Sequence, residues 1–159
     1  MDAKGFVRHD HDNCIASTLQ VVERECDERG LQLTPVRRKA LEVLVAQHRA
    51  MGAYDVLEKL RDAGLGSQPP VAYRALDFLV THGFAHRIEQ MNAFIACAHP
   101  GQRHAPIFLI CRGCSAVVEA PGRAASDALQ AAAAEIGFVT ERVVIEAEGL
   151  CPGCAKAKA

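Results

Sequence analysis

Four cysteines, arranged as two C-x-x-C pairs, form the clearest candidate metal site in the sequence. They are Cys111 with Cys114 and Cys151 with Cys154, and a glycine precedes the second cysteine of each pair. Two such turns can place four thiolates at the corners of a tetrahedron, which suits Zn²⁺ and fills its coordination shell. Glycine lets each backbone turn tightly, so that N–H groups can face the sulfurs. We therefore expect a structural zinc site. A redox dithiol, which lacks its usual strand-to-helix setting here, and an iron–sulfur cluster are the alternatives.

A second, looser group of possible metal ligands combines imidazole, thiol and carboxylate side chains. All three types are acceptable zinc ligands. The group comprises His86, Cys97, His99, His104 and Glu119. Spacing alone leaves two interpretations equally open: a second metal site, or surface histidines with a core thiol.

Composition places the chain among ordinary globular proteins. It has 159 residues, of which 50% are hydrophobic and 23% charged, enough for one medium domain or two small ones. No apolar stretch approaches the roughly 20 residues of a membrane span, and no export signal is evident. We therefore expect a cytoplasmic protein without a membrane partner, whose seven cysteines are metal ligands and core thiols rather than disulfides.

The elements that precede the second group predict a winged helix-turn-helix. Apolar residues at helical spacing predict four short helices, the first around 15–29 and the last opened by Pro69-Pro70 and ended by Gly83. Two strand-like runs, 84–89 and 93–97, then predict a hairpin around 90–92. In this arrangement the helix before the hairpin enters the DNA major groove. The net charge of −1 does not by itself indicate DNA binding, although residues 31–90 are mildly basic.

The chain therefore divides into a DNA-binding domain over 1–97, a linker over 98–104 and a second domain over 105–159. Within the first, 1–14 are expected to be a flexible tail, whose His9, His11 and Cys14 could bind metal but are more simply exposed. The second predicts strands 107–111, 115–120 and 138–147 and a helix whose apolar stripe runs from Ala125 to Ile136. So small a domain needs a metal or a partner subunit.

These features together resemble the ferric uptake regulator family, from about residue 15 to Cys154. The resemblance is carried by Leu33-Thr34-Pro35-x-Arg37, Ala53-Tyr54-Asp55-Val56-Leu57, Val71-Ala72-Tyr73-Arg74-Ala75-Leu76, Gly83-Phe84 and the two cysteine pairs. It implies an α+β protein, with an N-terminal winged helix-turn-helix domain followed by a small α/β dimerisation domain that holds the four-Cys zinc site. Tyr73 and Arg74 would then lie on the recognition helix, with Tyr54 as a further DNA contact.

Within that family the chain is most similar to the zinc uptake regulator branch. Iron and peroxide sensors usually carry a His-His-x-His cluster before the first cysteine pair, whereas this chain has only His104 there. The zinc branch uses a sensor set that matches His86, Cys97, His104 and Glu119. The resemblance implies two zinc ions per chain, one structural and one regulatory. Two departures stand out: Val71 replaces the usual threonine, and His99 is an additional candidate ligand.

The function implied is a zinc-responsive, homodimeric repressor that binds palindromic operator DNA and controls zinc uptake genes. The alternatives are an iron- or manganese-sensing regulator of the same family, or a zinc-binding interaction module. An enzyme with Glu119 as general base would need an open zinc position. Four protein ligands leave no such vacancy.

Overall fold

The computed structural model describes residue 6 and residues 11–158 except residue 48, and these residues form two compact units that divide between Gln102 and Arg103. This boundary falls within the predicted linker, 98–104. Most of the predicted tail, His9 included, lies outside the described residues, as does the side chain of His11. We find no helix in the described part of the chain with the length and hydropathy of a membrane span.

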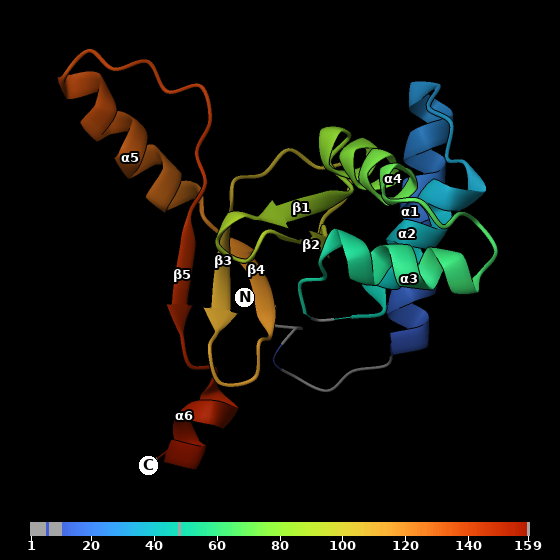
Figure 1. Cartoon of the computed structure of the whole chain (residues 1–159). Helices are drawn as coiled ribbons and strands as arrows, with labels where there is room; N and C mark the ends of the chain where they lie inside the picture. The colour runs from blue at the N-terminus through green and yellow to red at the C-terminus, as the bar shows by residue number, and fades with distance from the viewer. Residues whose placement is uncertain (1–5, 7–10, 48, 159) are drawn as a thin grey trace. The chain divides into compact units, whose positions relative to one another are not determined.

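Four helices build the N-terminal unit, as the apolar spacing predicts (Figure 1). They are α1 (His11–Arg29), α2 (Pro35–Val45), α3 (Ala53–Asp62) and α4 (Pro69–Thr81). Thr34 caps α2 because its Oγ1 accepts a hydrogen bond from the backbone N–H of Arg37 at 3.4 Å, and Pro35 fills the first helical position. α1 begins at His11, so residues 11–14 extend a helix where a flexible tail was expected.

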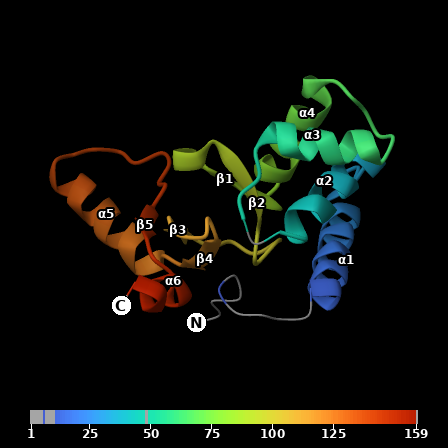
Figure 2. The ribbon, with the colours of Figure 1, turned by 60° about the horizontal axis from the view of Figure 1, so that its bottom comes forward.

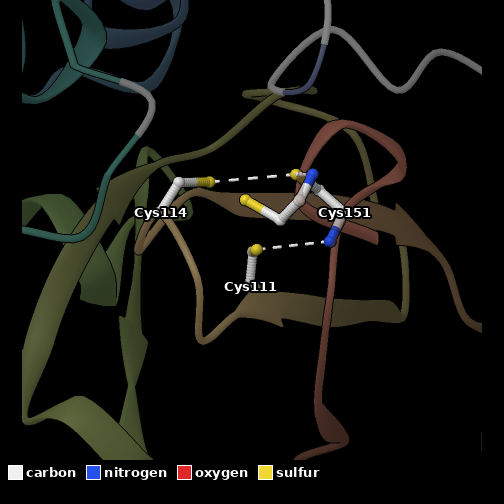
Figure 3. A group of neighbouring side chains, drawn as sticks. Cys111, Cys114 and Cys151 are labelled. Atoms are coloured by element: carbon white, nitrogen blue, oxygen red, sulfur yellow. Dashed lines mark hydrogen bonds between the residues drawn. The ribbon is translucent and has the colours of Figure 1, made fainter. Parts of the chain in front are cut away.

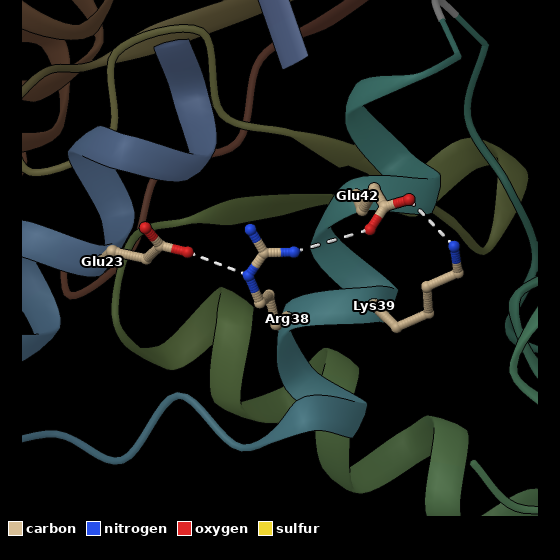
Figure 4. Close-up of polar contacts among 4 residues, drawn as sticks. All are labelled: Glu23, Arg38, Lys39 and Glu42. Atoms are coloured by element: carbon tan, nitrogen blue, oxygen red, sulfur yellow. Dashed lines mark hydrogen bonds and ion pairs between the residues drawn. The ribbon is translucent and has the colours of Figure 1, made fainter. Parts of the chain in front are cut away.

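The buried faces of these helices form one hydrophobic core. Leu41, Leu44, Leu60, Leu76 and Leu79 are among its fully buried side chains. An ion pair between Arg38 and Glu23, at 2.9 Å, adds a surface link between α1 and α2 (Figure 4). Within α2, Glu42 contacts Arg38 at 3.8 Å and Lys39 at 2.8 Å. Because these side chains are substantially exposed, each pair contributes at most about 1 kcal/mol. Burial of apolar surface therefore does most to hold the helices together.

A hairpin follows the fourth helix, as predicted. β1 (Ala85–Ile88) pairs antiparallel with β2 (Ala93–Ala96), with Ala85 opposite Ala96. A short 3-10 turn, η2 (Glu89–Met91), and left-handed Asn92 (φ 46°) close it. Met51 exchanges two backbone hydrogen bonds of 2.8 Å with Phe94, which joins the loop before α3 to the hairpin. Helices followed by such a hairpin constitute a winged helix-turn-helix.

The C-terminal unit contains a three-stranded sheet and two helices. Its strands are β3 (Pro106–Cys111), β4 (Val117–Pro121) and β5 (Glu146–Gly149), in the order β4-β3-β5. β3 runs antiparallel to β4 and parallel to β5. The connection between β4 and β5 contains α5 (Arg123–Glu135). The chain continues into α6 (Pro152–Lys158).

Two strand predictions for this unit were wrong. Ser115 takes a left-handed conformation (φ 60°), so β4 starts at Val117 rather than at 115. Of the predicted strand 138–147, only Glu146 and Ala147 lie in β5, and Figures 1 and 2 show that the segment before β5 extends away from the sheet with α5. The predicted helix is present as α5, but most of its apolar stripe is exposed, with Ala133 half-buried and Ser126 buried. These apolar segments lack a covering surface within the described chain.

Candidate metal centres and nucleic-acid interface

The four cysteines of the two C-x-x-C pairs come together in the C-terminal unit. Parallel pairing places Cys111 opposite Gly149, so the turn after β3 lies beside the segment that follows β5. The sulfur atoms of Cys111, Cys114, Cys151 and Cys154 all lie within 4.8 Å of one another. Figure 3 shows the sulfurs of Cys111, Cys114 and Cys151 directed toward a common centre. Four convergent thiol donors fit a tetrahedral zinc site.

Backbone N–H groups prepare this cluster for negative charge. The N–H of Cys151 donates to Cys111 Sγ at 3.2 Å, and the N–H of Cys154 donates to Cys151 Sγ at 3.4 Å. The Cys151 backbone hydrogen bond is the main cause that lowers the pKa of Cys111 to about 6. Side-chain hydrogen bonds to Cys151 and Cys111 raise the pKa of Cys154 to about 12. Because cysteine binds zinc as the thiolate, zinc binding must release the proton of any ligand whose pKa is raised, as that of Cys154 is.

The glycines of the two C-x-x-C pairs do not have the predicted role of allowing a tight backbone turn. Neither Gly113 nor Gly153 has a positive φ. The left-handed residue at the first pair is Ser115, which follows Cys114. A Cβ atom on Gly113 would lie 3.0 Å from Cys154 Sγ and 3.1 Å from its Cβ. A Cβ on Gly153 would come no closer than 3.9 Å to Cys151 Sγ. Gly113 thus provides space for the opposite cysteine, while Gly153 lies in the first turn of α6.

Two of the predicted sensor ligands, His86 and Cys97, lie on one face of the hairpin in the N-terminal unit. His86 pairs with Ile95, and the N–H of Cys97 donates to the Phe84 carbonyl at 3.0 Å. Because opposite residues and alternate residues share a face, His86 and Cys97 project on the same side at diagonal positions. Cys97 is 2% exposed, and its Sγ accepts a hydrogen bond from the N–H of His99 at 3.4 Å.

The other two predicted sensor ligands, His104 and Glu119, lie together in the C-terminal unit. His104 precedes β3, and Glu119 lies on β4 opposite Phe108. Their side chains meet, with 2.5 Å between His104 Nε2 and Glu119 Oε1. The Glu119 side chain is only 4% exposed. The carboxylate and the imidazole therefore form a hydrogen-bonded pair, whose oxygen and nitrogen must separate to bind one ion together.

Gly122, which was not predicted as a structural residue, lies at a close contact beside the His104 segment. It precedes α5, and its N–H donates to the Ala105 carbonyl at 2.8 Å. A Cβ atom there would lie 2.4 Å from Ile107 Cγ2, 2.8 Å from Ala105 O and 2.9 Å from Ile107 N. The turn after β4 thus lies directly against the chain that follows His104. A glycine between a strand and a helix was the available sequence signal.

We expect Gly122→Ala to lower the free energy of unfolding of the zinc-loaded protein by about 1–3 kcal/mol, because backbone atoms must move to admit the methyl group. Gly149→Ala is the matched control, since a Cβ on Gly149 meets nothing within 4 Å. Thermal and denaturant unfolding followed by circular dichroism measures both variants. Equal stability of the two variants would show that the backbone at Ala105 can move to admit the methyl group without loss of unfolding free energy.

The residues predicted to contact DNA are exposed on the N-terminal unit. Tyr54 in the first turn of α3 is 67% exposed and Tyr73 on α4 is 44% exposed, and Arg74 beside it is also exposed. Val71, in place of the family's usual threonine, packs on Gly66: a Cβ on Gly66 would lie 2.8 Å from its Cγ1. Arg74 and the two tyrosines therefore remain available to a ligand, whereas Val71 supports the start of the helix.

Comparisons with known proteins agree with this arrangement. The chain is 39% identical over 142 residues to the zinc uptake regulation proteins of Escherichia coli (strain K12) and Shigella flexneri, covering 89% of this chain and 83% of each relative. A solved zinc uptake regulator complexed with zinc and DNA superposes with a TM-score of 0.86 at 37% identity, covering 91% of this chain and 97% of that one. Holo XcZur gives 0.80 at 42% identity, covering 88% and 98%.

No protein-family model matches the chain. The curated relatives nevertheless span most of its length at an identity well above the level at which only the fold is shared. The chain therefore belongs to the zinc uptake regulator branch of the ferric uptake regulator family.

Proposed function

We propose that this chain is a zinc-responsive, homodimeric repressor that binds palindromic operator DNA when its sensor site is filled, and so controls zinc uptake genes. The observation that carries the proposal is the common face of His86 and Cys97 on the hairpin that directly follows α4. A metal bound there acts on the element adjoining the recognition helix. The chain is a cytoplasmic regulator and not an enzyme, and it holds two zinc ions, one structural and one regulatory.

The sensor site is completed by His104 and Glu119, which join His86 and Cys97 in one ligand set. Each pair is fixed within its own unit, but the two pairs are separated in the sequence by residues 98–103. Zinc supplies a tetrahedral centre that accepts imidazole, thiolate and carboxylate donors. When all four ligands share one ion, the two units cannot reorient freely. In a symmetric dimer, this restraint fixes the spacing of the two recognition helices.

Charge favours the same switch. With Cys97 as thiolate and Glu119 as carboxylate, the four ligands without metal carry two negative charges, which Zn²⁺ cancels. A neutral site reduces repulsion of DNA phosphates, whose contacts dominate the affinity of DNA-binding proteins. By linkage, DNA that selects the zinc-bound conformation must tighten zinc binding in return.

Dimerisation is supported by the apolar residues that the C-terminal unit leaves uncovered. Leu129 is 42% exposed, Ile136 and Val139 are each 82% exposed, and Phe138 is 63% exposed. Contiguous exposed apolar side chains indicate a surface for another protein. In a closed two-fold dimer, the same surface of each subunit supplies both sides of the interface.

Arg74 is proposed to read a base, because an exposed arginine on the recognition helix can donate two hydrogen bonds to guanine O6 and N7. We expect Arg74→Ala to weaken binding to its preferred duplex by about 1–3 kcal/mol and to relax specificity at one position. Arg61→Ala, an exposed arginine on α3, controls for the lost charge. Fluorescence anisotropy on the selected and on a scrambled duplex compares them. Equal weakening on both duplexes would make Arg74 a phosphate contact.

Sensing of iron or manganese is less favoured because Cys97 supplies a soft thiolate, which prefers zinc to Fe²⁺ or Mn²⁺. The proposed function is tested by selecting duplexes from a random-sequence pool with the full-length protein, in excess zinc and after removal of sensor zinc. Enrichment of a palindrome only with zinc supports the proposal. Enrichment of no sequence, or enrichment that needs iron or manganese, contradicts it.

A further inference from the structure

The turn that leaves the ligand Cys97 packs against Glu25, a residue of α1 that the metal site does not use. We propose that Glu25 is a positioning residue for the sensor site: its contact with Gly101 sets the direction in which the chain leaves Cys97. This inference rests on the proposed function, because it concerns how readily the second pair of ligands reaches the first.

The segment from Cys97 to Gln102 is an ordered turn tied to the ligand atom itself. The N–H of His99 donates to Cys97 Sγ at 3.4 Å, and the N–H of Gln102 donates to the His99 carbonyl at 3.3 Å. Gly101 takes a φ of +79°, a left-handed conformation that glycine adopts without steric cost. A change in this turn therefore affects the sulfur that binds the metal.

The Glu25 side chain lies directly across Gly101. A Cβ atom on Gly101 would be 2.5 Å from Glu25 Cδ, 2.7 Å from its Oε1 and 2.9 Å from its Cγ. Glu25 is half-buried beside the fully buried Cys26. The end of α1 is also held to the end of α4, since Arg29 Nη1 donates to the His82 carbonyl at 3.0 Å. The turn thus rests on a well-anchored helix.

Support of this kind matters because residues 98–103 alone separate Cys97 from His104. A turn that is free to change direction must be ordered when the ligands gather around one ion, and that ordering opposes binding. Glu25 restricts the turn before zinc arrives. Its removal should therefore weaken sensor zinc while leaving every ligand in place.

The first test compares Glu25→Ala with Glu28→Ala, which removes the same charge from an exposed position on the same helix. Competition with a chromophoric chelator measures the affinity of the exchangeable zinc in the full-length dimer, without DNA. We expect about threefold to tenfold weaker zinc binding for Glu25→Ala and none of this loss for Glu28→Ala. The melting temperature of protein that carries only structural zinc should be the same for both variants. A purely structural role for Glu25 would instead lower the melting temperature of Glu25→Ala. Equal zinc affinity of both variants would overturn the proposal.

The second test uses Gly101→Ala, with Gly30→Ala as control. Both glycines have a positive φ, but a Cβ on Gly30 meets nothing within 4 Å. We expect weaker sensor zinc binding for Gly101→Ala alone, and a smaller effect of this substitution when Glu25 is already alanine. If the effects of the two substitutions on zinc affinity were strictly additive, Glu25 and Gly101 would not be coupled and the proposal would be contradicted. A wild-type protein that binds no exchangeable zinc would contradict the proposed function as well, whereas unchanged variants of a zinc-binding wild type overturn only this inference.

Discussion

Cys111→Ser is expected to remove one zinc ion per chain and to abolish cooperative unfolding of the C-terminal unit. Cys111 is 1% exposed, ends the central strand β3 and accepts the N–H of Cys151, so its sulfur connects both halves of the cluster. Few apolar side chains are buried in this unit, and most of those on α5 are exposed. Small domains of this kind take much of their folding free energy from a structural zinc.

Cys14→Ser is the matched control for that substitution, because Cys14 is a half-buried thiol on α1 outside both ligand sets. Zinc content by mass spectrometry and thermal unfolding by circular dichroism check the two variants together. Retention of full zinc content by the Cys111 variant would show that this cysteine is not a ligand. Loss of zinc without loss of structure would show that the sheet stands without the metal.

Cys97→Ser is expected to remove zinc-dependent DNA binding while leaving the structural zinc and the fold intact. Serine is close to cysteine in size, so it fills the buried position. Its hydroxyl stays protonated at neutral pH and cannot replace the thiolate as a zinc ligand. Loss of an outer partner alone typically costs 10- to 100-fold in metal affinity, so losing a direct ligand should cost about 100-fold or more. DNA binding at limiting zinc should fall in proportion.

Anisotropy titrations with zinc at fixed duplex concentration measure this effect, and Cys14→Ser again serves as the control. Melting of protein that carries only structural zinc should be nearly unchanged by Cys97→Ser. An unaltered zinc requirement for DNA binding would remove Cys97 from the sensor site. A variant that loses both zinc ions would instead indicate that the substitution disrupts the fold.

The sequence predicts the N-terminal unit well because each of its helices buries its own apolar face and carries local boundary signals. Thr34 with Pro35 marks the start of α2, and Gly83 follows the end of α4. The four-Cys cluster is equally local, since each pair forms one short segment. These features depend on neighbouring residues, which sequence patterns record directly.

Features that depend on distant or absent surfaces could not be predicted in the same way. Helical spacing predicts the apolar stripe on α5 but not what covers it, and the described chain provides no surface over Leu129 or Ile136. Gly113 was assigned a turn role, whereas its neighbour is Cys154, forty-one positions away. Spacing alone left the sensor ligands open, and only the family resemblance selected His86, Cys97, His104 and Glu119.

Zinc-controlled DNA binding is tested by native mass spectrometry of the dimer bound to its selected duplex, during a graded titration with a zinc chelator. We expect DNA-bound dimers to carry two zinc ions per chain and to release the DNA as the first, exchangeable zinc leaves each chain. The dimer should remain intact with one zinc per chain until much more chelator is added. Dimers that keep DNA with only one zinc per chain would contradict zinc-controlled DNA binding.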